Sequence, residues 1–108
     1  MKHSIKSSSK FIPFALLLVS ISATADTANG KKIYDRWCAH CHDAGSGYAG
    51  TMMLTLTRDE GVIKNNSTLD PDYIETVVRK GLGMMPMMRK TEIGDADLAD
   101  LISYIKNN

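Results

Sequence analysis

The chain has 108 residues, of which 13 are lysine or arginine and 12 are aspartate or glutamate, so its formal net charge is +1. This length suits one small domain. The near balance of charge gives no support to nucleic-acid binding, which usually requires a strongly basic surface.

The first 25 residues have the layout of a secretory signal peptide. Lys2, Lys6 and Lys10 precede an apolar run at residues 11–21, and Ala23-Thr24-Ala25 supplies the small residues of a cleavage site. The run is about half of the ~20 residues that a membrane-spanning helix needs. We therefore predict that residues 1–25 are removed, which leaves residues 26–108 as the mature domain without an integral membrane segment. An uncleaved N-terminal anchor is the alternative.

The mature chain would carry ten basic and twelve acidic residues, so it is mildly acidic. A domain of this size buries a limited core and usually needs additional stabilisation, such as a large bound group. Its first predicted helix covers residues 27–41, with an apolar stripe at Ile33, Tyr34, Trp37 and Cys41. Gly30 lies within that helix, where glycine costs ~1 kcal/mol relative to alanine. A glycine at this point indicates close approach of another helix.

The only two cysteines lie at the end of this helix, in the segment Cys38-Ala39-His40-Cys41-His42. The pattern Cys-x-x-Cys-His is the attachment signature of c-type haem. Two thiols one helical turn apart can form thioethers with the two vinyl groups of a single haem. His42 is then placed under the iron as the proximal ligand. The segment predicts one covalent haem c with its iron, whereas His40 points away from it.

Two other interpretations of this segment are weaker. A Cys38–Cys41 disulfide of the thioredoxin type would need a βαβ pattern, which the chain lacks. For zinc, Cys38, Cys41 and His42 lie too close together to share one tetrahedral ion easily, and no second Cys/His pair follows.

The segment at residues 43–69 is rich in glycine and predicts a loop around the edge of the haem, with one short helix near residues 58–64. Its apolar residues would face the ring; they are Met52, Met53, Leu54 and Leu56. A second clear helix covers residues 71–80, capped by Asp70, started by Pro71 and ended by Gly81.

The third main helix is predicted to begin near Asp95, with an apolar stripe at Leu98, Leu101, Ile102 and Ile105. The acidic residues Asp95, Asp97 and Asp100 are most simply interpreted as solvated helix charges. We expect no strand in the mature region, so the predicted fold class is all-α.

Four of the six mature methionines cluster at residues 84–88, between the last two helices. Thioether sulfur is a soft ligand that favours Fe(II), so a methionine opposite the histidine would raise the reduction potential and suit electron transfer. Methionine clusters are more often core filler, and spacing alone does not say which methionine would bind.

Together these residues resemble bacterial class I c-type cytochromes. The match rests on Gly30 and Tyr34, on the Cys-x-x-Cys-His segment, and on Val77-Val78-Arg79-Lys80-Gly81 leading to Met85-Pro86. The resemblance implies a cytochrome c fold of three main helices around one haem. It implies that Met85 is the distal ligand opposite His42, and that Gly30 and Tyr34 meet Leu101 or Tyr104.

The chain departs from that family at two points. Many members have a proline after the haem motif whose carbonyl accepts a hydrogen bond from the proximal histidine, but no proline occurs between His42 and Pro71. Many members also have an aromatic residue where this chain has Met88.

The resemblance implies a periplasmic electron carrier rather than an enzyme. Its donor would be a flavin or quinoprotein dehydrogenase, and its acceptor an oxidase or another cytochrome of a respiratory chain. One alternative is a haem protein with an open distal site that reacts with gases or peroxide as a sensor or enzyme. Another is a thiol-redox protein without haem.

Overall fold

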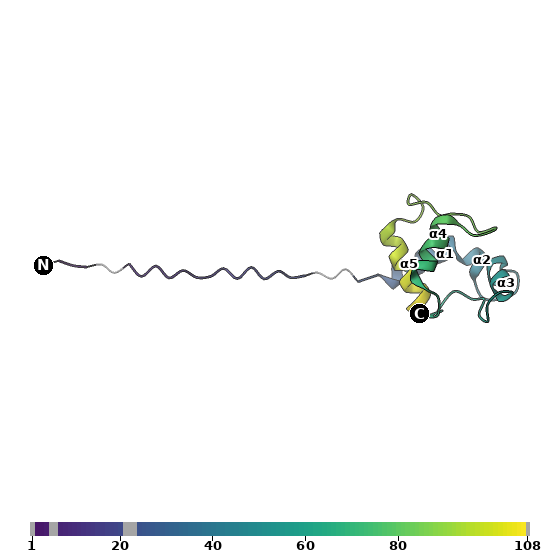
Figure 1. The fold of residues 1–108 in the computed structure, drawn as a ribbon, viewed down its shortest axis with the longest axis horizontal. Coiled ribbons are helices and arrows are strands. Elements are labelled where there is room, and N and C mark those ends of the chain that lie inside the picture. The colour runs from purple at the N-terminus through teal and green to yellow at the C-terminus, as the bar shows by residue number, and fades with distance from the viewer. Residues whose placement is uncertain (1, 5–6, 21–23, 108) are drawn as a thin grey trace.

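The computed structural model describes residues 2–4, 7–20 and 24–107. Residues 7–20 have no regular secondary structure, and Figure 1 shows this segment leading away from a helical body. No helix among the described residues is long and apolar enough to cross a membrane. Part of the predicted cleavage site, Ala23, lies outside the described residues, so the signal peptide stays a prediction.

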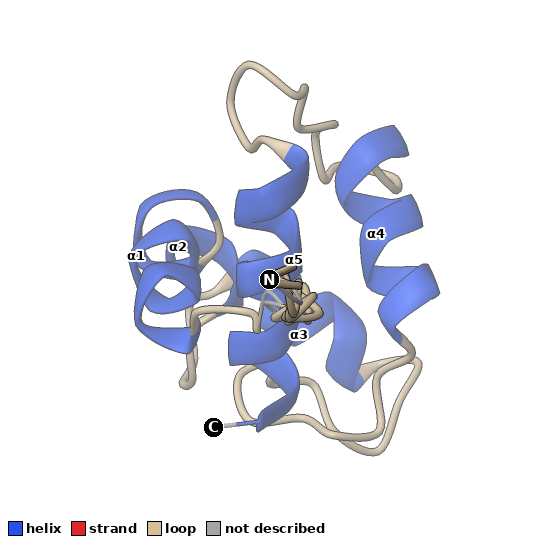
Figure 2. Ribbon diagram, turned by 90° about the vertical axis from the view of Figure 1, so that its left-hand side faces the viewer, coloured by secondary structure: helices blue, strands red, loops and turns tan. Residues whose placement is uncertain are grey.

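The body consists of helices joined by loops. They are α1 (Thr27–Trp37), α2 (Ala39–His42), α3 (Ala49–Thr55), α4 (Pro71–Lys80) and α5 (Asp95–Asn107). Within residues 24–107 the only extended pairing is an isolated bridge between Leu82 and Met85. The all-α prediction is therefore confirmed. Figure 2 shows α5 between α1 and α4, and α5 packs against both.

The crossing of α1 and α5 explains Gly30. A Cβ built on Gly30 would lie 2.7 Å from Tyr104 Cβ and would also collide with the backbone of Asp100. One turn further along α1, the ring of Tyr34 lies 5.4 Å from that of Tyr104. The predicted contact of Gly30 and Tyr34 with Tyr104 is confirmed.

The buried apolar side chains form one core. They are Tyr34, Leu69, Ile74, Val78, Ile93, Leu98, Leu101, Tyr104 and Ile105. Most of them lie on α4 and α5, and α5 packs against both α1 and α4. Neither α2 nor α3 contributes an apolar side chain to this core.

Both ends of α4 agree with the sequence. Asp70 accepts a hydrogen bond from the backbone N of Tyr73 at 3.0 Å, and Pro71 takes the first position. Gly81 ends the helix with a φ of 72°, a conformation that favours glycine.

Two predicted helix boundaries were wrong. The first helix ends at Trp37, because Cys38 caps it and the chain turns into α2. The short helix expected near residues 58–64 lies earlier, at α3. Residues around Gly61 instead pack back onto α3, where a Cβ on Gly61 would lie 2.6 Å from the carbonyl of Thr51. That close packing requires an irregular backbone.

The acidic residues of α5 are not simply solvated. Asp97 and Asp100 accept hydrogen bonds from the Asn29 amide at 2.9 Å and 2.8 Å, and Asp100 also accepts one from the Asp26 backbone at 2.7 Å. Asp95 pairs with Arg79 and Lys90. These bonds tie the start of α1 and the end of α4 to α5.

We expect Gly30→Ala to lower the free energy of unfolding by about 1–3 kcal/mol, because the added methyl group overpacks the helix crossing. Helix propensity alone would change stability in the opposite direction, by ~1 kcal/mol. Unfolding in guanidinium chloride measures the net effect of overpacking and helix propensity on the free energy of unfolding. Lys32→Ala, at an exposed position of the same helix, is the control. A stabilised Gly30→Ala protein would contradict the tight crossing.

Candidate functional site

One largely apolar cavity of about 540 Å³ lies among the α1–α2 turn, α3, α4, the loop at residues 82–88 and α5. Binding sites for small molecules and cofactors usually measure about 300–1,000 Å³ and have mainly apolar walls with a few polar groups. The cavity is therefore large enough for a prosthetic group.

The structure brings all four predicted site residues to this cavity. Cys38, Cys41 and His42 line it from the α1–α2 turn, and Met85 lines it from the loop that follows α4. His40 is exposed and does not line it. Residues far apart in the sequence thus share one site.

The turn after α1 explains the spacing of the two thiols. The backbone N–H groups of Cys41 and His42 both donate to the carbonyl of Cys38, at 3.1 Å and 2.9 Å. Cys38 and Cys41 are therefore one turn apart, where side chains lie on the same face. No disulfide joins the two cysteines.

The environment of Cys38 does not suit thiol-redox chemistry. Burial raises the pKa of the Cys38 thiol to about 12, because a thiolate is poorly solvated there. Reactive cysteines of disulfide oxidoreductases instead have lowered pKa values. An environment that disfavours the thiolate weakens the thiol-redox interpretation.

His42 is held as a neutral imidazole. Burial lowers its pKa, since the charged form loses hydration. Its Nδ1 is buried and has no hydrogen-bond partner among the described residues. The hydroxyl of Tyr34 donates to the His42 carbonyl at 3.0 Å, which fixes the backbone below the ring. A neutral imidazole is the form that binds a metal.

Gly50 of α3 supports this ring from the side and was missed by the sequence analysis. A Cβ on Gly50 would lie 2.5 Å from His42 Cε1 and 2.7 Å from His42 Nδ1. The run of glycines after the Cys-x-x-Cys-His segment was the only available signal.

The loop at residues 82–88, called the methionine loop below, contains a tight turn. The backbones of Leu82 and Met85 exchange hydrogen bonds at 3.1 Å and 3.0 Å, and Gly83 between them has a φ of 57°. Met85 and Met88 are half-buried and line the cavity, whereas Met84 at its rim is 96% exposed. Burial therefore favours Met85 or Met88 over Met84 as the methionine that would bind the iron.

Only part of the apolar surface expected from α3 faces the cavity. Met53 and Leu54 line it, whereas Met52 and Leu56 do not and are largely exposed. The prediction for Met52 and Leu56 was wrong, because a seven-residue helix presents only one side to the cavity. Ile93 and Leu69, which the sequence analysis did not assign to the site, complete the wall.

These residues fit a covalently attached haem. The cavity is apolar, two thiols lie one turn apart at its wall, a neutral imidazole follows them, and a thioether comes from a separate loop. The Nδ1 edge of the His42 ring faces Gly50 of α3, which leaves Nε2 as the ring nitrogen available for the iron.

Residues 25–105 match the family model described as cytochrome c oxidase, cbb3-type, subunit III. The chain belongs to this family. It is a small c-type cytochrome, and its cofactor is a covalently bound haem c with iron. Members of the family carry electrons.

Named relatives agree with that assignment. The cytochrome c subunit of 4-cresol dehydrogenase [hydroxylating] from Pseudomonas putida is 29% identical over 98 residues, covering 89% of this chain and 76% of that protein. Cytochrome c6 from Cyanidioschyzon merolae is 28% identical over 101 residues, covering 94% and 92%. A crystal structure of p-cresol methylhydroxylase with substrate bound matches with a TM-score of 0.55 and 27% identity, covering 72% of this chain and 89% of that chain.

We expect Gly50→Ala to destabilise the cytochrome by about 1–3 kcal/mol, because the new methyl group collides with the His42 ring. Its visible spectrum should change as well, since the ring must move. Lys32→Ala, at an exposed position of α1, is the control, and it should stay within about 0.5 kcal/mol. Equal behaviour of the two variants would contradict the contact of Gly50 with His42.

Proposed function

We propose that this cytochrome is a periplasmic single-electron carrier in which Cys38 and Cys41 hold the haem and His42 and Met85 bind its iron. The observation that supports the proposal is the convergence of these four residues on one apolar cavity. Haem iron with histidine and methionine ligands cycles between Fe(III) and Fe(II), and the soft thioether favours Fe(II).

Each group of residues around the cavity has its own role in this proposal. The α1–α2 turn presents the thiols and the imidazole together, and Gly50 and Tyr34 hold His42 in place. Ile93, which is fully buried, and Leu69 keep water from the cavity wall. In this proposal the site binds and orients the cofactor, and the protein transfers electrons without acting on a substrate.

Electron exchange with partners is proposed to take place at the rim formed by the methionine loop. Leu82, Met84 and Met87 are exposed there, and no charged residue occurs at residues 81–88. A small apolar surface of this kind suits a transient redox contact.

The proposed donor is a flavin or quinoprotein dehydrogenase. The support is the relative from Pseudomonas putida, which is named the cytochrome c subunit of a dehydrogenase, and the similar crystal structure of p-cresol methylhydroxylase. The electron would pass on to an oxidase or to another cytochrome of a respiratory chain.

Export is proposed to remove residues 1–25. The helical body starts directly after this segment, because Asp26 caps α1 and its backbone N lies 2.7 Å from Asp100 Oδ1. Cleavage after Ala25 would turn that nitrogen into a terminal amine facing a carboxylate. The proposed boundary therefore falls where the folded domain can accept a new chain end.

Met85→Ala should abolish the far-red charge-transfer band that a methionine ligand gives to ferric haem, and ferrous protein should then bind carbon monoxide. Covalent haem should remain, because the thioethers are untouched. Met84→Ala is the matched control, since Met84 is 96% exposed. Loss of the band in Met84→Ala alone would refute the assignment. A high-spin ferric spectrum in the unmutated protein would favour an open-site sensor or enzyme.

The intact mass of the exported protein should equal residues 26–108 plus one haem, and the haem should stay attached in denaturant. Cys41→Ser should leave at most one thioether and lower the yield, because the small domain loses part of its attachment to the group that fills its cavity. A mass beginning before Asp26 would contradict the proposed processing. Haem released on denaturation of the unmutated protein would contradict covalent attachment.

A further inference from the structure

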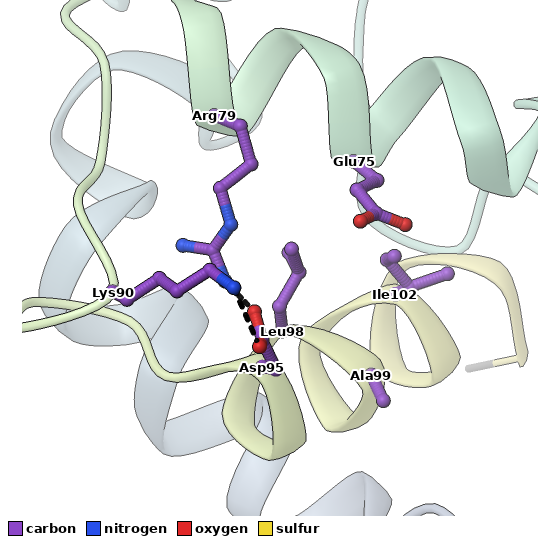
Figure 3. A pocket seen from close by; sticks show the side chains of 7 residues that line it. All are labelled: Glu75, Arg79, Lys90, Asp95, Leu98, Ala99 and Ile102. Atoms are coloured by element: carbon purple, nitrogen blue, oxygen red, sulfur yellow. Dashed lines mark hydrogen bonds and ion pairs between the residues drawn. The ribbon is translucent and has the colours of Figure 1, made fainter.

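Arg79, near the end of α4, donates to three acceptors that lie at the end of the methionine loop or after it. Its guanidinium donates to the carbonyl of Met88 at 3.3 Å, to the carbonyl of Ile93 at 2.7 Å and to Asp95 Oδ1 at 2.8 Å. Figure 3 shows Arg79 extending from α4 toward Asp95 at the start of α5, where Lys90 also meets that carboxylate. The side chain of Arg79 is only 17% exposed.

Two of these acceptors belong to the wall of the haem cavity. The side chains of Met88 and Ile93 line the cavity, and Ile93 is fully buried. The backbone N of Met88 also donates to the carbonyl of Val78 at 2.7 Å. Met88 is thus bonded to α4 on both its N–H and its carbonyl, three residues after Met85. Since Pro86 restricts the backbone between them, the position of Met85 depends on this attachment.

An arginine suits this contact better than a lysine. A guanidinium offers five donors in a planar fork and can serve two carbonyls and a carboxylate together, whereas the donors of lysine radiate from one nitrogen. Hydrogen bonds from charged groups contribute more than neutral ones. Asp95 is held by Lys90 as well, and these hydrogen bonds lower its pKa, so it remains an anion facing Arg79.

We propose that Arg79 is a positioning residue for the distal ligand, which holds the backbone of Met88 and Ile93 so that Met85 stays on the iron. This inference rests on Met85 being the ligand, as proposed above. Without Arg79 the methionine loop opens locally more often, while the crossing of α1 and α5 stays intact. External ligands then reach the iron more easily, because their apparent affinity follows the population of the open form.

The test is a titration of the ferric holoprotein with imidazole, which competes with the methionine. Arg79→Met should raise the apparent affinity for imidazole by about tenfold. On heating, its far-red band should weaken at a lower temperature than that of the unmutated protein. Arg79→Lys should restore part of the difference. Lys80→Met, which removes the same charge from the neighbouring exposed position, should behave like the unmutated protein.

Guanidinium unfolding of each variant separates positioning from general stability. A purely structural role would lower the unfolding midpoint of Arg79→Met and leave its imidazole affinity unchanged, and that result would overturn the proposal. If Arg79→Met does not accumulate, the same titration is done with Asp95→Asn and Arg79→Lys. Unchanged imidazole affinity in both variants would overturn the proposal equally.

Failure of the ligand assignment is recognised separately. If the far-red band is absent from the unmutated protein, or survives in Met85→Ala, then Met85 is not the ligand. The proposed role of Arg79 is then wrong as well. If the band depends on Met85 but imidazole affinity does not depend on Arg79, only the positioning role is wrong.

Discussion

The contact between α1 and α5 is the interaction on which the rest of the structure depends. Gly30 lets the two helices meet at backbone distance, and Tyr34 packs on Tyr104 one turn later. The hydroxyl of Tyr34 then reaches the carbonyl of His42. The Cys-x-x-Cys-His segment is therefore attached to the C-terminal helix through one buried side chain. In a small domain with a limited core and a large cavity, this contact links elements that a larger core would otherwise hold together.

The two sides of the cavity are held by different kinds of contact. The histidine side depends on close packing, through the helix crossing and through Gly50 against the imidazole. The methionine side is a loop held by backbone hydrogen bonds and by the guanidinium of Arg79. A loop held mainly by hydrogen bonds opens more readily than packed helices. The loop that carries Met85, the proposed distal ligand, can therefore open while the rest of the domain stays folded.

Much of this architecture follows from local signals. Asp70, Pro71 and Gly81 predict both ends of α4, because capping and positive φ are properties of single residues. The break at Cys38 was missed, since residues 27–41 read as one continuous apolar stripe. The place of α3 was missed because short apolar runs between glycines carry little periodicity. The sequence predicts solvated acidic residues on α5, because the partners of Asp97 and Asp100 lie about seventy positions earlier in the chain.

The sequence by itself determined the cofactor, the family and the main helices, because the spacing of Cys38, Cys41 and His42 and the helix caps are local chemistry. The tertiary structure alone decided which groups support the site. It placed Gly50 against His42, and it left Met84 exposed while Met85 is half-buried. It also brought Arg79 to the carbonyls of Met88 and Ile93. Such contacts depend on how the helices pack around the cavity, and no local pattern encodes that packing.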